Sequence, residues 1–179
     1  FIEDVSENKG SIKQLLNEKN SLDQNMESLS FYDQLTGVYN RRFYEKELAH
    51  MDESQQYPLS VIMMNINGMS KINYDYGHAV GDILMRKAVQ VLKYGVRGDD
   101  VVARYEGDEF VILMPRTEGA KVERALERFR KNMNEIKVQS LKVSVSFGFA
   151  TKYDESEKIE QVVAAALKQL ERQKEIDYI

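Results

Sequence analysis

A largely apolar run from Leu59 to Ile66 places the strongest constraint on how this chain can fold. Asn67 and Gly68 close the run, and a short apolar stretch bounded in this way is typical of a strand that is buried on both faces. Such a strand needs covering layers on both sides of its sheet. The run therefore predicts a layered α/β domain with this strand near its centre.

The neighbouring segments alternate between helical and strand patterns. After residue 30 we expect a helix, a strand, two helices, a strand, a hairpin turn, a strand, a helix, a strand and a last helix. Asn40 and Thr117 are expected to cap two of the helices, and Leu141 to Ala150 alternates as a half-buried strand does. We predict a mostly antiparallel sheet covered by helices, with the two strands that flank residues 106 to 108 at its centre.

The turn between these two strands is unusually acidic. It places Glu106, Asp108 and Glu109 around Gly107, and adjacent carboxylates repel one another unless a cation or solvent lies near them. Two interpretations are open, a solvated turn and a site for a divalent cation with a phosphate ester. The charges alone favour the solvated turn.

Residues 1–30 carry a heptad pattern instead. Two series spaced by seven residues and offset by three make up its seam: Val5, Ile12, Lys19 and Met26, and Phe1, Asn8, Leu15, Leu22 and Leu29. The pattern predicts a helix that pairs as a parallel dimeric coiled coil, and the alternative is an amphipathic helix that lies on its own domain. We take residues 1–30 as a signalling helix and residues 31–179 as the globular domain.

Composition excludes several functional classes. The net charge of −4 argues against a broad surface for nucleic acid. The absence of cysteine excludes disulfides and thiolate metal sites, and two histidines are too few for a His-rich zinc site. No apolar run is long enough to span a membrane and no signal peptide is visible. We expect a cytoplasmic domain without membrane contact of its own, either free or part of a larger membrane-anchored protein, because the chain begins with Phe1 rather than Met.

Four fragments in order resemble one family, the GGDEF domains or diguanylate cyclases. Asp33–Arg42 resembles the family's opening motif, and Asn73–Asp82 its Asn-Asp-x-Tyr-Gly-His-x-x-Gly-Asp run. Glu106–Phe110 stands where the Gly-Gly-Asp-Glu-Phe signature belongs, and Val145–Ala150 resembles the strand that follows. The resemblance covers residues 31 to about 175 and implies a ferredoxin-like palm, as in class III nucleotide cyclases.

The resemblance also implies a chemistry. In this family two GTP molecules on two domains are joined into cyclic di-GMP, and two Mg²⁺ ions hold the triphosphates. Asp108 stands at the metal ligand of the signature, with Glu109 beside it, while Asn73 and Asp82 stand at the positions that read guanine. Pairing through residues 1–30 would then join a homodimer to an upstream sensor domain.

The chain departs from the family where the phosphates and metal belong. Asn65 replaces a metal-binding Asp, Asn67 replaces a second acid, and Glu106 replaces the first glycine of the signature. In the last helix Glu171 and Glu175 stand where a phosphate-binding Lys and Arg belong. These changes weaken the binding of Mg²⁺ and triphosphate. A shifted alignment would let another cation serve there: Lys168, Arg172 or Lys174.

A further motif, Arg97-Gly-Asp-Asp100, precedes the hairpin. In this family an Arg-x-x-Asp at this place marks an inhibitory site that binds the product, cyclic di-GMP. An Arg can present its fork to guanine O6 and N7, and an Asp can accept from the N–H edge of the base. Arg128 is expected to supply a second arginine. The alternative is a salt bridge that caps a turn.

Three hypotheses follow. The leading one is a degenerate GGDEF domain without catalysis or cofactor, which acts as a regulatory or receptor module for cyclic di-GMP. The second is an active, Mg²⁺-dependent diguanylate cyclase that makes cyclic di-GMP from GTP. The third is a structural module that dimerises or binds a protein partner and no nucleotide.

Overall fold

The computed structural model describes the backbone of residues 2–177 and the side chains of residues 8–26 and 30–177. The chain divides into two compact units, Phe1–Tyr32 and Asp33–Ile179. The first unit is helix α1 (Ile2–Leu29). Its described apolar side chains are 52–68% exposed, as expected of a helix with an unpaired stripe: Ile12, Leu15, Leu16, Leu22 and Met26. The seam positions Phe1, Val5 and Leu29 lie outside the described side chains, and the coiled coil stays a prediction.

The second unit follows the predicted order of helices and strands, with one small addition. The strands β4 and β5 form a short extra hairpin that the sequence did not predict. The elements are α2 (Arg41–Glu53), β1 (Leu59–Ile66), α3 (Met69–Tyr76), α4 (His78–Gly95), β2 (Val101–Glu106), β3 (Glu109–Met114), α5 (Gly119–Asn134), β4 (Lys137–Val138), β5 (Leu141–Lys142), β6 (Val145–Lys152) and α6 (Ile159–Asp177). Within residues 2–177, no helix combines the length and the apolar character needed to cross a bilayer.

The main sheet has the strand order β2-β3-β1-β6, and every neighbouring pair is antiparallel. Every residue of β1 is buried, so the predicted central strand is confirmed. The expectation that both hairpin strands are central is wrong for β2. Because β3 pairs with β1, β2 lies at the edge of the sheet. On its outer side, Ala103 of β2 forms an isolated β-bridge with Tyr39.

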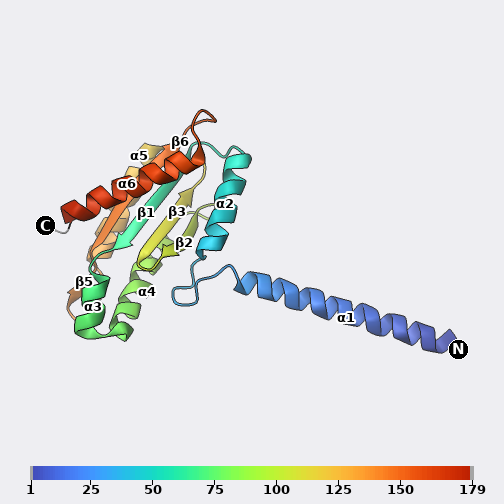
Figure 1. The fold of residues 1–179 in the computed structure, drawn as a ribbon. Helices are drawn as coiled ribbons and strands as arrows, with labels where there is room; N and C mark the ends of the chain where they lie inside the picture. The colour runs from blue at the N-terminus through green and yellow to red at the C-terminus, as the bar shows by residue number, and fades with distance from the viewer. Residues whose placement is uncertain (1, 178–179) are drawn as a thin grey trace. The chain divides into compact units, whose positions relative to one another are not determined.

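Helices cover both faces of this sheet. Figure 1 shows α2 and α6 on one face, and α4 and α5 on the other. Alternate side chains of β1 enter the two cores: Ile62 and Met64 pack towards α4 and α5, whereas Val61 and Met63 pack towards α2 and α6. The predicted fold class, a mixed α/β domain with an antiparallel sheet covered by helices, is confirmed.

Of the two predicted helix caps, one is present in the structure and the other is not. Asn40 caps α2 as predicted, since its Oδ1 accepts from the backbone N–H of Phe43 at 3.0 Å. The predicted cap of α5 is wrong, because Glu118 occupies the N-cap position. The buried hydroxyl of Thr117 donates to the carbonyl of Pro115 and accepts from Arg97 instead. The strand predicted over residues 141–150 is divided, because β5 ends at Lys142 and β6 begins at Val145.

Candidate functional site

A tight turn joins β2 to β3 and presents the acidic residues. Gly107 has φ +52°, in the left-handed region that glycine adopts at little cost. Arg104 fixes this turn, because its Nε donates to the carbonyl of Gly107 at 2.8 Å. The Nη1 of the same side chain lies 3.2 Å from Asp33 Oδ1. Arg104 therefore connects the hairpin to the start of the Asp33–Arg42 segment, so the two motifs form one structural unit.

The hairpin carries more negative than positive charge. Glu106 is exposed, while Asp108 and Glu109 are half-buried. Lys174 of α6 lies near Glu109, with its Nζ 3.9 Å from Glu109 Oε1, and it also lies 3.2 Å from Glu171 Oε1 on its own helix. Burial raises the pKa of Glu109, and the neighbouring carboxylates raise it further while Lys174 opposes them. The positive charge of Lys174 is thus shared between two carboxylates.

The end of β1 holds amides where the family resemblance implies acids. Asn65 lies opposite Glu109 of β3 and Ser146 of β6. Its Nδ2 donates to Asn67 Oδ1 at 2.9 Å, and Asn67 Nδ2 donates to Ser146 Oγ at 2.9 Å. Ser146 Oγ donates in turn to Asp177 Oδ2 at 2.5 Å. The buried side chains of Asn65, Asn67 and Ser146 are therefore hydrogen-bonded in series, and the series ends at the exposed Asp177.

This set of side chains does not fit a Mg²⁺ site. Magnesium prefers oxygen ligands in near-octahedral geometry, usually including carboxylates. Among the described side chains of residues 8–26 and 30–177, no three from His, Cys, Asp or Glu gather closely enough to hold a metal ion. The side-chain oxygen of Asn67 faces the N–H donor of Asn65. Asp108 and Glu109, the expected remnants of the signature, thus lack the ligand partner that the family would supply from β1.

The α6 positions are placed as follows. Glu171 and Glu175 are exposed, and Glu171 forms an ion pair with Lys174 rather than offering a positive charge. Of the three cations that a shifted alignment suggested, Lys174 is the one with an ion pair to the hairpin among the described contacts. Lys168 and Arg172 are exposed on the same helix.

The two predicted guanine-reading residues come from α3 and α4. Asn73 Oδ1 is buried, and among the described residues it has no hydrogen-bond partner. A Cβ on Gly81 would come within 1.9 Å of this oxygen, so the glycine makes room for the Asn73 side chain immediately before Asp82. A buried acceptor without a partner is stabilised when a hydrogen-bond donor binds it, and an N–H group of a base is such a donor.

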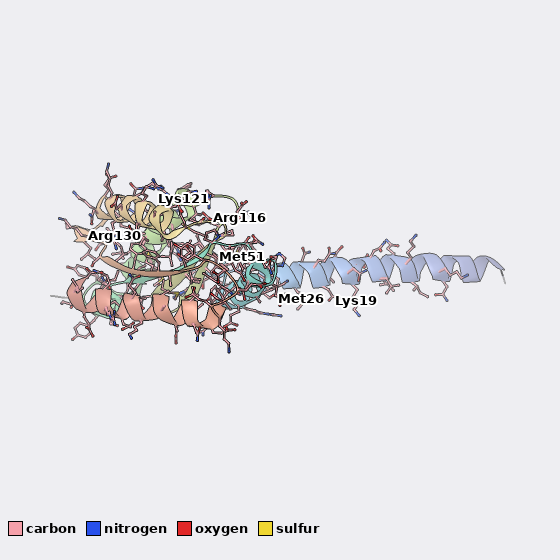
Figure 2. The ribbon with its side chains drawn as sticks, turned by 90° about the horizontal axis from the view of Figure 1, so that it is seen from above. Lys19, Met26, Met51, Arg116, Lys121 and Arg130 are labelled. Atoms are coloured by element: carbon pink, nitrogen blue, oxygen red, sulfur yellow. The ribbon has the colours of Figure 1, made fainter. Side chains whose placement is uncertain are left out.

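A second site is a cavity of about 340 Å³ between the end of α4 and α5. It is lined by the three predicted residues Arg97, Asp100 and Arg128, and by two cations that the sequence analysis missed, Lys121 and Arg124. Their spacing on α5 was the available signal, because residues 121, 124 and 128 share one helix face. Figure 2 shows Lys121 near the start of α5 and Arg116 in the loop before it.

Asp100 is the most deeply placed charge of this basic cavity. Its side chain is 1% exposed and its Oδ2 accepts from the backbone N–H of Arg97 at 2.8 Å. Its Oδ1 lies 3.6 Å from Arg97 Nη2 and has no hydrogen-bond partner within the described part of the chain. Burial raises the pKa of Asp100, although Arg97 opposes this effect. The cavity therefore contains a buried carboxylate, one oxygen of which has no hydrogen-bond donor among the described residues.

Two arginines of the cavity, Arg97 and Arg128, donate hydrogen bonds to neighbouring oxygens. Arg97 has a side chain that is 58% exposed, and its Nη2 donates to the hydroxyl of Thr117 and to the carbonyl of Pro115 at 3.4 Å. Arg128 Nη2 donates to the carbonyl of Gly95 at 2.7 Å. Both guanidinium groups thus keep further N–H donors for a ligand.

Known proteins resemble this chain in sequence. The profile of the family described as "Diguanylate cyclase, GGDEF domain" matches residues 30–177. The response regulator PleD of Caulobacter vibrioides is 36% identical over 119 residues, which cover 65% of this chain and 26% of the relative. The diguanylate cyclase DosC of Escherichia coli is 34% identical over 127 residues, which cover 66% of this chain and 27% of the relative. The chain thus spans about a quarter of the length of these curated relatives.

Solved structures resemble it in fold. The GGDEF domain of DgcB from Caulobacter crescentus, in complex with c-di-GMP, superposes with a TM-score of 0.76 at 25% identity and covers 82% of this chain and 91% of that chain. A form of DgcB with its coiled coil superposes with a TM-score of 0.82 at 23% identity, covering 93% of this chain and 94% of that chain. Together with the family profile, these likenesses show that the chain belongs to the GGDEF domain family of diguanylate cyclases.

Proposed function

We propose that this domain is a receptor for cyclic di-GMP, which it binds in the basic cavity, and that it does not synthesise the dinucleotide. The buried carboxylate of Asp100 is the observation that carries the proposal. Among described residues its Oδ1 has no hydrogen-bond donor, yet it lies in a cavity whose other charged residues are cations. A buried acceptor of this kind costs stability unless a partner satisfies it.

The chemistry of the cavity matches a guanine dinucleotide. Asp100 accepts from the N1–H and N2–H edge of guanine, and Arg97 donates to O6 and N7. Lys121 and Arg124 then face the two phosphates, where opposite charge attracts them. Because Arg97 is more than half exposed and its ion pair with Asp100 is long, we expect this side chain to move over the base when the ligand enters.

The hairpin site supports the second half of the proposal, the lack of synthesis. Glu106, Glu109 and Glu171 face the place of a triphosphate with negative charge, and Lys174 is already paired. Each missing charge-assisted contact to the nucleotide or metal costs about 1.5–3 kcal/mol. Several such losses together lower the affinity for Mg²⁺–GTP by orders of magnitude.

The proposal includes the role of α1. The exposed apolar side chains at Ile12, Leu15 and Leu22 support pairing of two chains through residues 1–30. A parallel pair would hold two copies of the domain together and connect them to an upstream sensor domain in the full-length protein.

Cyclase activity is the alternative that a specific observation favours. Asp108 and Glu109 of the signature are retained, and a relative that is 34% identical is named a diguanylate cyclase. Incubation with GTP and either Mg²⁺ or Mn²⁺, followed by chromatography of the products, separates the two functions. Formation of cyclic di-GMP would contradict the second half of the proposal.

Calorimetric titration with cyclic di-GMP tests the first half. We expect saturable binding to the wild-type domain, and a loss of at least about hundredfold in affinity for Arg97→Ala, because two or more charge-assisted hydrogen bonds disappear. Arg116→Ala is the matched control, since this exposed arginine pairs with Asp99 outside the cavity lining. No heat at high micromolar ligand, or an equal loss in both variants, would remove the receptor function.

A further inference from the structure

The side chains around the end of β1 form a chain of hydrogen bonds with one direction. Asn65 donates to Asn67, Asn67 donates to Ser146, and Ser146 donates to Asp177. We call these four residues the polar chain. Three of its residues are between 1% and 7% exposed, namely Asn65, Asn67 and Ser146. The polar chain therefore runs through the interior of the domain and ends at the carboxylate of Asp177, on the last turn of α6.

We propose that the polar chain takes the structural place of the metal ions and fastens the C-terminal turn of α6 to the sheet. The inference deepens the proposed lack of catalysis, and it rests on that half of the proposed function. A metal site gathers several oxygens around one centre. Here the side-chain oxygens of Asn67, Ser146 and Asp177 each face an N–H or O–H donor instead.

The last turn of α6 has further contacts that act in the same direction. Gln173 Nε2 donates to Asp177 Oδ1 at 2.9 Å, so both oxygens of this carboxylate are engaged. One turn earlier Lys174 pairs with Glu109 of β3. The helix end is thereby attached to β6 through Asp177 and to β3 through Lys174. Hydrogen bonds in such a series polarise and strengthen one another.

The direction of the hydrogen bonds in the polar chain determines the effect of the reversion Asn65→Asp. Asn65→Asp removes the N–H donor and places a carboxylate oxygen opposite Asn67 Oδ1. The Asn67 amide then turns over to donate to the new carboxylate, and its oxygen accepts from the Ser146 hydroxyl. That hydroxyl can no longer donate to Asp177, so the helix end is released.

Hydrogen–deuterium exchange of the amides in residues 173–177 measures this release. We expect Ser146→Ala to speed their exchange about tenfold relative to wild type, because one charge-assisted bond is lost. Ser144→Ala is the matched control. Ser144 also accepts from Asn67, at 3.1 Å, but lies outside the polar chain, so exchange in α6 stays unchanged. If Ser146→Ala does not fold, Asp177→Ala at the exposed helix end tests the same bond.

Two variants of Asn65 then test the direction. Asn65→Asp should speed exchange in α6 as Ser146→Ala does, whereas Asn65→Ala leaves the bonds from Asn67 onward intact and should not. Equal exchange in Asn65→Asp and wild type would overturn the proposal, as would equal effects of the Ser144 and Ser146 variants.

A titration with Mg²⁺ tests whether the polar chain takes the structural place of the metal ions. We expect the melting temperature of the wild-type domain to stay the same in millimolar Mg²⁺. A rise in melting temperature that Asp108→Asn abolishes would show a metal site and contradict the inference. The cyclic di-GMP titration uses other residues, so its failure and the failure of the polar chain are distinguishable.

Discussion

The β2–β3 hairpin and the basic cavity belong to one domain but have opposite electrostatic character. At the hairpin the three carboxylates of Glu106, Asp108 and Glu109 gather, and the two neighbouring cations Lys174 and Arg104 are already paired with carboxylates. In the cavity, four cations surround the one buried carboxylate of Asp100. The proposed function rests on this contrast, because the phosphates of a nucleotide carry negative charge. The contrast teaches that a fold and the position of its signature can persist while positive charge gathers at another place in the domain.

Reversing the charges at the hairpin is the most severe test of this contrast. Restoring four of the five family residues, Asn65→Asp, Glu106→Gly, Glu171→Lys and Glu175→Arg, should raise the affinity for Mg²⁺–GTP by at least about hundredfold, because several charge-assisted contacts return together. Nucleotide titration and product chromatography measure the gain. Glu123→Lys with Glu127→Lys, which adds positive charge at exposed positions of α5, is the control. Equal gains in both proteins would show a non-specific effect of charge.

Removing the carboxylate of the cavity should have the next largest effect. We expect Asp100→Asn to weaken cyclic di-GMP about tenfold to hundredfold, because an acceptor of guanine N–H groups becomes partly a donor. Calorimetry compares it with Asp99→Asn, a change at the exposed neighbour that pairs with Arg116. Identical affinities of the Asp100→Asn variant and the wild type would show that guanine is read elsewhere.

A smaller effect is expected for the cations that face the phosphates. Lys121→Ala should weaken cyclic di-GMP about threefold to tenfold and make the affinity less sensitive to salt, because one exposed attraction is lost. The control is Lys131→Ala, at an exposed position further along α5. An unchanged salt dependence would contradict a phosphate contact by Lys121.

Periodicity made the framework predictable from sequence. The apolar run at Leu59–Ile66 indicated the buried central strand, and Asn40 indicated a helix start, because both signals are local. The edge position of β2 was not predictable in the same way. Both hairpin strands contain an apolar run, and the choice of which one pairs with β1 depends on long-range contacts that no local pattern contains.

The residues of the two candidate sites were likewise predictable where they form a local motif, and not where tertiary contacts bring them together. Arg97 and Asp100 form a local motif and were found in the sequence, whereas Lys121 and Arg124 looked like the solvated face of an amphipathic helix. Thr117 was taken for a helix cap because its partner, Arg97, lies 20 residues earlier in the chain. The bond from Ser146 to Asp177 spans 31 residues. Such polar contacts depend on tertiary structure, since any serine and aspartate of the chain could in principle form them.

The titration of Asp100 gives the smallest expected effect and tests the cavity without changing its shape. Burial raises the pKa of this carboxyl above its ordinary value of 3.8, so protonation begins at a higher pH than for an exposed aspartate. A protonated Asp100 accepts guanine N–H groups poorly. The affinity for cyclic di-GMP should therefore fall as the pH is lowered through the range in which Asp100 becomes protonated, and Asp100→Asn should flatten this dependence. The free energy of unfolding changes in the opposite sense. Because the folded pKa exceeds the unfolded one, the folded state binds more protons between the two values, and wild type gains stability relative to Asp100→Asn as the pH falls through that window. Calorimetry and urea unfolding at matched pH measure the two effects, and a parallel change in both would contradict this role of Asp100.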